Sequence, residues 1–261
     1  MLTALALLVV SAAPPVGSEW TWTIDDQRAL KLTSPKGELS VDPHLEKMTL
    51  EVTVTEASEE ALRKFTVFVK AGNVNLRNLK FEVESNYGEA VVKDVTPNEG
   101  KRRVGLNELT IALATGAPAP ELPAFRRALA QLFKADPIVA AAKGAKCTPE
   151  TGAAVAKAVG ETMMKIKTER DNQETVTNAA GTCVGSDGTK YAVSFTLNAP
   201  FRDQTTEVSM KGTVTVPPEA WRASWDASGP LHMKLQTGKK PIQIDGTIGL
   251  KTSFTSKKKK K

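Results

Sequence analysis

The feature that most restricts how this chain can fold is an alternation of apolar and polar residues with a period of two. It occurs at Trp20–Ile24 and Met48–Val54, and it returns at Tyr191–Leu197 and Val208–Val216. Alternation of this kind is typical of β-strands that bury one face and leave the other in water. Turn sequences such as Ser34–Gly37 separate these segments. The pattern therefore predicts a mostly β protein with antiparallel strands.

The middle of the chain has a different period and predicts helices. After the proline-rich segment Gly116–Pro120, apolar residues recur at helical spacing from Phe125 to Phe133 and from Val155 to Ile166. Asp136-Pro137 and Thr148-Pro149 each read as a helix N-cap followed by proline in the first helical position.

The predicted fold class is α+β, mostly β. We expect an N-terminal β region at 19–115, a central helical segment at 116–170 and a C-terminal β region at 171–256. Curved antiparallel sheet or sheets from the two β regions would pack against the helical segment. Gly212, Gly246 and Gly249 lie inside predicted strands, where glycine is typical of bulges and strong curvature.

The first twelve residues predict export. Leu2–Val10 carries no charge, and its length matches the apolar core of a signal peptide and is about half of what spans a bilayer. Signal peptidase prefers small residues at the third and first positions before the cut, and Val10-Ser11-Ala12 followed by Ala13 satisfies this. Residues 1–12 are therefore interpreted as a signal peptide. The amino-terminal end lacks Lys and Arg, and the alternative is a buried N-terminal strand. We expect a soluble extracytoplasmic protein, periplasmic or secreted, with no transmembrane segment.

The formal net charge of +6 comes mainly from the C-terminal end. Without the tail there are 30 basic and 29 acidic residues, so the body is nearly neutral and does not indicate a nucleic-acid partner. A lysine run is typically solvated and disordered, and it can bind weakly to an anionic surface. It can equally be an addition foreign to the natural chain. The tail consists of Lys257, Lys258, Lys259, Lys260 and Lys261.

The two cysteines, Cys147 and Cys183, predict a disulfide. An even pair in an exported protein usually forms a bridge. Closing this loop contributes about 3–4 kcal/mol of stability on the chain-entropy model.

Patterns for catalysis and metal binding are weak. His44 and His232 lie far apart in the sequence, and either is a possible base for a hydrolase. Gly181–Gly185 has the G-x-S-x-G spacing of a nucleophile elbow, with Cys183 in the position of the serine. The elbow requires a strand–turn–helix setting, whereas a hairpin turn is expected here. No ligand spacing for a metal and no phosphate-binding loop occurs in the sequence. We therefore assign no catalytic residue, no metal and no cofactor.

The four tryptophans are the candidate ligand-binding residues. Trp20 and Trp22 share one face of a predicted strand, and Trp221 and Trp225 are one turn apart on a predicted short helical segment. Large apolar side chains of this kind can line a ligand cleft. The alternative is that they fill the core at one end of the sheet.

Basic clusters at Lys101–Arg103, Arg126-Arg127 and Lys239-Lys240 can contact anionic head groups or phosphates if the fold brings them together. Taken separately, each is more typical of a solvated turn or helix face, and without interleaved aromatic residues they do not form a nucleic-acid platform.

Two functions from different classes are consistent with these features. The first is non-catalytic binding of a lipid or other apolar molecule between the curved sheet and the helices. The second is an envelope or surface scaffold that contacts an anionic partner, and a hydrolase is the third. An apolar space between helices and sheet favours binding, whereas a solid core favours the scaffold.

Overall fold

The computed structural model of the chain describes most residues between Pro14 and Lys257. The described ranges are 14–27, 29–34, 36–41, 47–57, 63–72, 76–86, 89–97, 126, 129–130, 132–134, 136–142, 146–167, 175–184, 189–201, 204–217, 221–237 and 240–257. The predicted signal peptide at 1–12, the segment Gly116–Pro120 and the last four lysines lie outside these ranges.

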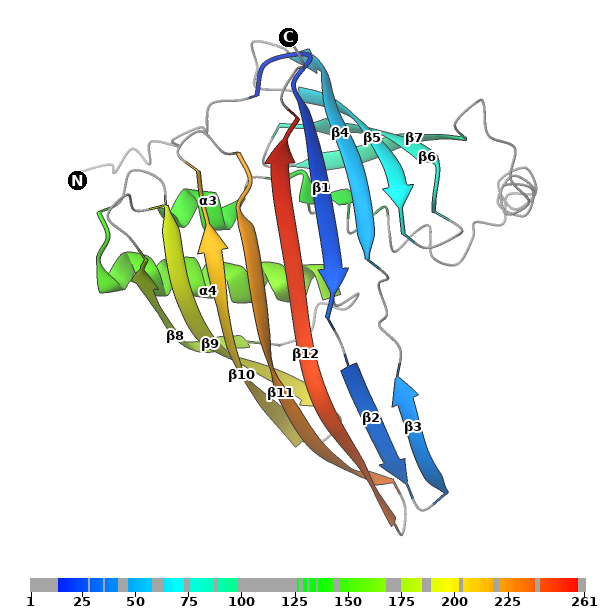
Figure 1. The fold of residues 1–261 in the computed structure, drawn as a ribbon, viewed down its shortest axis with the longest axis vertical. Coiled ribbons are helices and arrows are strands. Elements are labelled where there is room, and N and C mark those ends of the chain that lie inside the picture. Colours follow the sequence, from blue (N-terminus) through cyan, green and yellow to red (C-terminus); the bar gives the residue numbers. More distant parts are fainter. Residues whose placement is uncertain are drawn as a thin grey trace, which may run out of the picture.

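The described residues form 12 strands in a single antiparallel sheet and two labelled helices (Figure 1). The elements are β1 (Glu19–Asp26), β2 (Ala29–Ser34), β3 (Gly37–Val41), β4 (Met48–Ala57), β5 (Arg63–Ala71), β6 (Leu79–Ser85), β7 (Ala90–Pro97), α3 (Pro137–Ala142), α4 (Pro149–Lys167), β8 (Thr175–Cys183), β9 (Lys190–Phe201), β10 (Gln204–Thr215), β11 (Ser224–Thr237) and β12 (Lys240–Ser256). This arrangement confirms the predicted mostly β, α+β fold with a curved sheet.

The two β regions of the sequence are joined at the middle of the sheet. The strand order is β7-β6-β5-β4-β1-β12-β11-β10-β9-β8, so β1 and β12 connect the N-terminal strands to the C-terminal ones. In their antiparallel register Trp20 lies opposite Ser256, and Trp22 lies opposite Phe254. The sheet is open, with β7 and β8 at the ends of this order.

Strand β12 is the longest element of the sheet, at 17 residues. It pairs with β11 from Lys240 to Thr252, and its other side pairs with β2 from Gln243 and with β1 up to Ser256. Figure 1 shows the β2–β3 hairpin and the end of the β11–β12 hairpin projecting together from the body. We call this four-stranded extension the ribbon: β2, β3, Leu231–Thr237 of β11 and Lys240–Thr247 of β12.

One face of the sheet is buried and apolar, as the alternation predicts. Along β1, the side chains of Trp20, Trp22 and Ile24 are buried while the intervening threonines are only half-buried. The same pattern in β4 buries Leu50 and Val52. We call the buried side the inner face and the other side the outer face. Helix α4 packs on β8 and β9, and α3 packs on α4.

Both predicted helix starts are confirmed. Asp136 Oδ1 accepts a hydrogen bond of 2.9 Å from the Ile138 N–H at the start of α3. Thr148 Oγ1 accepts one of 3.3 Å from the Thr151 N–H at the start of α4. These are N-cap contacts, which occupy backbone donors that the helix itself leaves unpaired.

The predicted cysteine pair lies where the start of α4 meets the end of β8. Cys147 and Cys183 are at disulfide distance, with their Cα atoms 6.0 Å apart. Beside them Gly152 of α4 touches Gly181 of β8 so closely that a Cβ on Gly152 would lie 1.9 Å from the Gly181 carbonyl oxygen. The backbones of helix and strand are therefore in direct contact at this end.

The segment containing Trp221 and Trp225 differs from the prediction. Trp225 lies in β11 rather than on a helix, and Trp221 lies in a bend just before that strand. The strand forms because Trp225 pairs with Val214 of β10 on one side and with Thr252 of β12 on the other. Tertiary pairing thus overrides the helical spacing of the two tryptophans.

Within the described ranges, no helix combines the length and the apolar character needed to cross a membrane.

Candidate functional site

Three of the four tryptophans meet on the inner face of the sheet in an aromatic cluster. Neighbouring rings have centroids 4.8 to 6.1 Å apart, in stacked, tilted and edge-on arrangements. The cluster consists of Trp20, Trp22, Phe65, Phe133, Trp221 and Phe254. Phe133 comes from the helical turn before α3, so this cluster is also where the helical segment meets the sheet.

The tryptophans belong to the buried core. Trp22, Trp221 and Trp225 are 3%, 5% and 4% exposed, and Trp20 is 9% exposed. The rings of the aromatic cluster pack on one another and fill the space they surround. This geometry corresponds to the core-filling alternative for the four residues, and a ligand contact through them stays a prediction.

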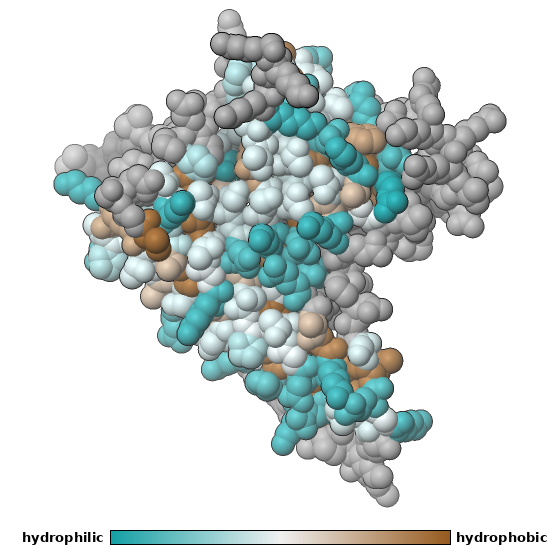
Figure 2. All heavy atoms as spheres, in the orientation of Figure 1, coloured by the Kyte–Doolittle hydropathy of each residue, from teal (hydrophilic) through white to brown (hydrophobic). Residues whose placement is uncertain are grey.

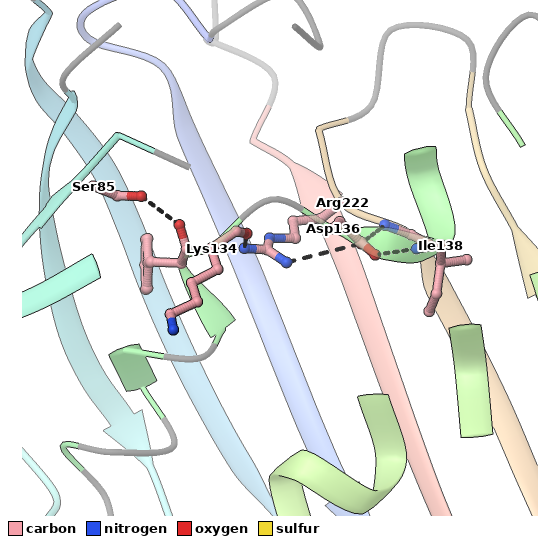
Figure 3. Close-up of polar contacts among 7 residues, drawn as sticks. Ser85, Lys134, Asp136, Ile138 and Arg222 are labelled. Atoms are coloured by element: carbon pink, nitrogen blue, oxygen red, sulfur yellow. Dashed lines mark hydrogen bonds and ion pairs between the residues drawn. The ribbon is translucent and has the colours of Figure 1, made fainter. Parts of the chain in front are cut away.

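A buried ion pair fastens the helical segment to the sheet next to the aromatic cluster (Figure 3). The Asp136 and Arg222 side chains are each 6% exposed, and Arg222 Nη1 lies 4.0 Å from Asp136 Oδ2. The guanidinium also donates to the Lys134 carbonyl and lies 5.7 Å from the ring centroid of Trp22 and 5.2 Å from that of Trp221. A carboxylate, a carbonyl and two aromatic faces therefore surround this buried cation.

Asp136 is held on several sides. Its Oδ1 caps α3, and its Oδ2 accepts a hydrogen bond of 2.8 Å from the Ala223 N–H just before β11. Nearby, the Ser85 hydroxyl at the end of β6 donates to the Phe133 carbonyl at 2.5 Å. The helical segment is therefore bonded both to the N-terminal strands and to the C-terminal strands, as Figure 3 shows.

A hollow of about 350 Å³ lies at the end of the sheet opposite the ribbon. Trp20 is the one tryptophan that borders it. The lining residues are Pro15, Val16, Gly17, Ser18, Glu19, Trp20, Ser256 and Lys257. This hollow therefore lies between the beginning of β1 and the end of β12, rather than between the sheet and the helices.

The inner face stays apolar beyond the aromatic cluster, along the ribbon. In β12 the inner-face series runs from buried Leu250 through half-buried Ile248 and Ile244. Met233 lies opposite Ile244 on β11, and Leu30 of β2 lies opposite Gly246. Directly opposed residues of an antiparallel pair lie on the same face. The ribbon therefore carries an apolar strip that is continuous with the core but only partly covered.

The outer face of the ribbon is polar. His232 Nδ1 and Asp245 Oδ1 are 2.9 Å apart, and Gln243 Nε2 donates to Asp245 Oδ2 at 2.6 Å. The hydrogen bond to His232, followed by the one to Gln243, holds the pKa of the Asp245 carboxyl below its usual value. Lys31 and Glu38 form an ion pair of 2.6 Å on the same face. The ribbon is thus amphipathic across its thickness.

The residues weighed for hydrolysis or metal binding do not come together among the described ones. Cys183 is paired with Cys147, and His232 lies on the exposed outer face beside Asp245. His44 lies outside the described residues. Within the part of the chain that the structure describes, no three His, Cys, Asp or Glu side chains are grouped to hold a metal ion.

Most members of the basic clusters in the sequence lie outside the described residues, Arg127 and Lys239 among them. Lys101–Arg103 lies outside the described residues. Lys257, counted above with the tail, donates its N–H to the Glu19 carbonyl, and its Nζ lies 2.9 Å from Glu51 Oε1. This contact, assisted by Lys70, holds the pKa of the Glu51 carboxyl below its usual value although partial burial opposes the shift. The tail thus starts from the end of the sheet opposite the ribbon (Figure 1).

No protein-family model matches the chain, and no curated protein is similar to it in sequence.

Sequence reasoning did not find two of these features. The Asp136–Arg222 pair joins residues far apart in the chain, and only the helix-cap half of it, Asp136-Pro137, has a local signal. The ribbon had a partial signal, since Leu30 and Leu32 alternate with Lys31 and Thr33 in a segment not singled out above.

Proposed function

We propose that this chain is an exported, non-catalytic protein that binds a lipid or other apolar molecule on the inner face of its curved sheet. The observation that carries the proposal is the partly covered apolar strip of the ribbon, formed by Leu30, Met233, Ile244 and Ile248. These side chains lie on the inner face of an open sheet, next to the packed core. An apolar ligand laid along them would finish the burial that the core begins.

The strip can contribute a gross binding energy of several kcal/mol to an acyl chain. Each buried methylene contributes about 0.8 kcal/mol, so about eight methylenes against the strip contribute roughly 6 kcal/mol before the costs of ordering are subtracted. The aromatic cluster is filled by its own side chains, so the ligand is expected beside it rather than inside it. Cys147 and Cys183 at disulfide distance support an oxidising, extracytoplasmic setting.

The proposal is tested with a matched pair of variants in β12. Ile244 faces the strip, and Thr247 is exposed on the outer face of the same strand, opposite Pro230. We expect the purified full chain to bind a fluorescent fatty acid. Ile244→Glu should weaken that binding at least about tenfold because a carboxylate is costly to bury against an acyl chain, whereas Thr247→Glu should not change it.

Circular dichroism on both variants checks that the fold is retained. Native mass spectrometry of the protein, before and after lipid extraction, reports any ligand that accompanies it. A protein that is empty in mass spectrometry and binds no fluorescent fatty acid would refute the proposal, as would equal binding by the two variants.

A surface scaffold is the second candidate, and the filled aromatic cluster favours it. Salt-sensitive retention on a cell-surface fraction is its expected behaviour. Unchanged retention of a chain that ends at Ser256 would show that the lysine tail has no role in this function.

A further inference from the structure

We propose that the free end of the ribbon binds the surface of an anionic lipid bilayer. This interaction goes beyond the proposed ligand site, because it uses Leu39 on the outermost strand β3 and the turn at Lys36 rather than the strip formed by Leu30, Met233, Ile244 and Ile248. It rests on the placement of apolar and charged side chains near the free end of the ribbon.

The first observation is an uncovered apolar residue on the inner face. Leu39 of β3 is 64% exposed. It lies opposite Leu32 of β2, which in turn lies opposite Ile244 of β12, so the three share one face. Figure 2 shows brown, hydrophobic surface at the β2–β3 hairpin, next to teal, hydrophilic surface. Apolar surface at the end of a projecting element is typical of a contact site.

The second observation is the excess of positive charge in the same place. The segments 29–41 and 231–247 contain five lysines and two carboxylates. Both carboxylates already have basic partners on the outer face: Glu38 pairs with Lys31, and Asp245 with His232. Lys36 lies in the turn between β2 and β3, and Lys234 is exposed on β11.

The third observation is that the two hairpins end side by side. Thr33 near the end of β2 lies opposite Gln243, three residues from the start of β12. Lys36 follows in the turn after Thr33, and Lys234 of β11 lies opposite the same Gln243. Described lysines of both hairpins, Lys36 in the turn and Lys234 on the outer face, thus lie near the free end of the ribbon that carries the apolar inner face.

This combination favours an anionic bilayer over a second copy of the chain. Two ribbons facing each other would bring two lysine-rich tips together, and like charges oppose that contact. Anionic head groups attract the lysines by about 1 kcal/mol each near the surface, while Leu39 and Leu32 enter the boundary between head groups and acyl chains. The bilayer surface therefore complements both the charge and the apolar side chains.

The test measures sedimentation of the full chain with vesicles. One set contains phosphatidylcholine with about one third phosphatidylglycerol, to supply the negative surface potential, and the other contains phosphatidylcholine alone. We expect binding to the anionic set, with a strong decrease at high salt because screening removes the lysine contribution.

Two substitutions at the tip should weaken this binding. Leu39→Ser should weaken it about tenfold, since most of a leucine side chain would no longer enter the bilayer. Lys36→Glu should weaken it at least about fivefold at low salt, with a smaller effect at high salt. Val91→Ser is the matched control, because Val91 is also an exposed apolar residue, 54% exposed on β7, and it should bind like the unmodified chain.

A chain that ends at Lys257 lacks the last four lysines, so it distinguishes vesicle binding by the ribbon from vesicle binding by the tail at the opposite end. If its binding is lost while Leu39→Ser binds normally, the tail is responsible and the proposal is wrong. If Leu39→Ser changes a dimer to a monomer without affecting vesicle binding, the occupant is a second copy and the proposal is also wrong. Fatty-acid binding by Leu39→Ser should be unchanged, so this interaction and the ligand site can fail independently.

Discussion

The contact between Gly152 and Gly181 gives a prediction in which two physical effects have opposite signs. Replacing a helix glycine with alanine normally stabilises the protein by up to about 1 kcal/mol, because alanine has the higher helix propensity. Here the new Cβ would lie 1.9 Å from the Gly181 carbonyl oxygen and 2.4 Å from its carbonyl carbon. Ordinary contact begins near 3.4 Å. Neither atom belongs to a flexible side chain.

The cost of Gly152→Ala follows from what α4 must do to make room. The start of the helix would have to move away from β8 by more than about 1 Å, and gaps of that size lose a quarter to a half of the dispersion energy of each contact. Val155 and Val159, both fully buried on α4, would lose part of their packing. Overpacking of this kind costs about 1–3 kcal/mol. Because the new Cβ meets rigid backbone, we expect the upper end of this range, about 3 kcal/mol, and a net loss of about 2 kcal/mol after a gain in propensity of up to about 1 kcal/mol.

Thermal unfolding under non-reducing conditions measures this loss. For a chain of this length, about 2 kcal/mol corresponds to a decrease in Tm of roughly 4–8 °C. Ala154→Gly, at an exposed position of the same helix, measures the propensity term alone and should cost about 1 kcal/mol. Gly160→Ala should cost less than Gly152→Ala, because its Cβ meets the side chains of Val176 and Phe195 rather than backbone. A Tm for Gly152→Ala equal to or above that of the unmodified protein would refute the packing of α4 on β8.

Two further variants test the polar contacts. Asp136→Ala should lower the free energy of unfolding by about 3–5 kcal/mol, because it leaves the buried Arg222 guanidinium without its carboxylate. Urea denaturation measures this free energy. Asp136→Asn should lose less stability than the alanine variant, because it keeps an acceptor for the helix cap. A loss below about 1 kcal/mol for Asp136→Ala would contradict the prediction. Glu51→Gln should cost at most about 1 kcal/mol at neutral pH. Because the pKa of Glu51 is lowered in the folded state, its ionised carboxylate stabilises the fold at pH values above the ordinary glutamate pKa, and this stabilisation is lost as the pH falls through the folded pKa. The difference in unfolding free energy between Glu51→Gln and the unmodified protein should therefore shrink below about pH 4. A difference that persists at low pH would exclude this linkage.

Local patterns in the sequence predicted the elements well where burial is one-sided. The alternation at Trp20–Ile24 and Met48–Val54 became β1 and β4, with the apolar members on the inner face. Asp136 and Thr148 cap helices where expected, because a cap needs only a few neighbouring residues. The cysteine pair was predictable since there are only two cysteines to pair.

Features that depend on long-range pairing were not predictable. Nothing near Trp225 indicates that Val214 and Thr252 will flank it, and its spacing from Trp221 suggested a helix instead. The order of strands in the sheet, with β1 beside β12, has no local signal either. The four tryptophans were identified as large apolar residues, but whether such residues fill a core or line a cleft depends on neighbours such as Phe133 and Arg222 that lie elsewhere in the chain.

The pairing of β1 with β12 affects how this protein can be made. During synthesis β1 emerges before the other described strands and β12 after them, so one side of β1 has no partner strand until all of those strands have been made. Loop-closure entropy makes such a distant pairing slow. Until it forms, the β1 edge and the apolar rings of Trp20 and Trp22 are exposed to other chains, and an unpaired edge of this kind is prone to aggregation. A chain shortened within β12 is therefore expected to be a hazard for the cell, which gives quality-control proteases and chaperones a structural reason to act on incomplete copies.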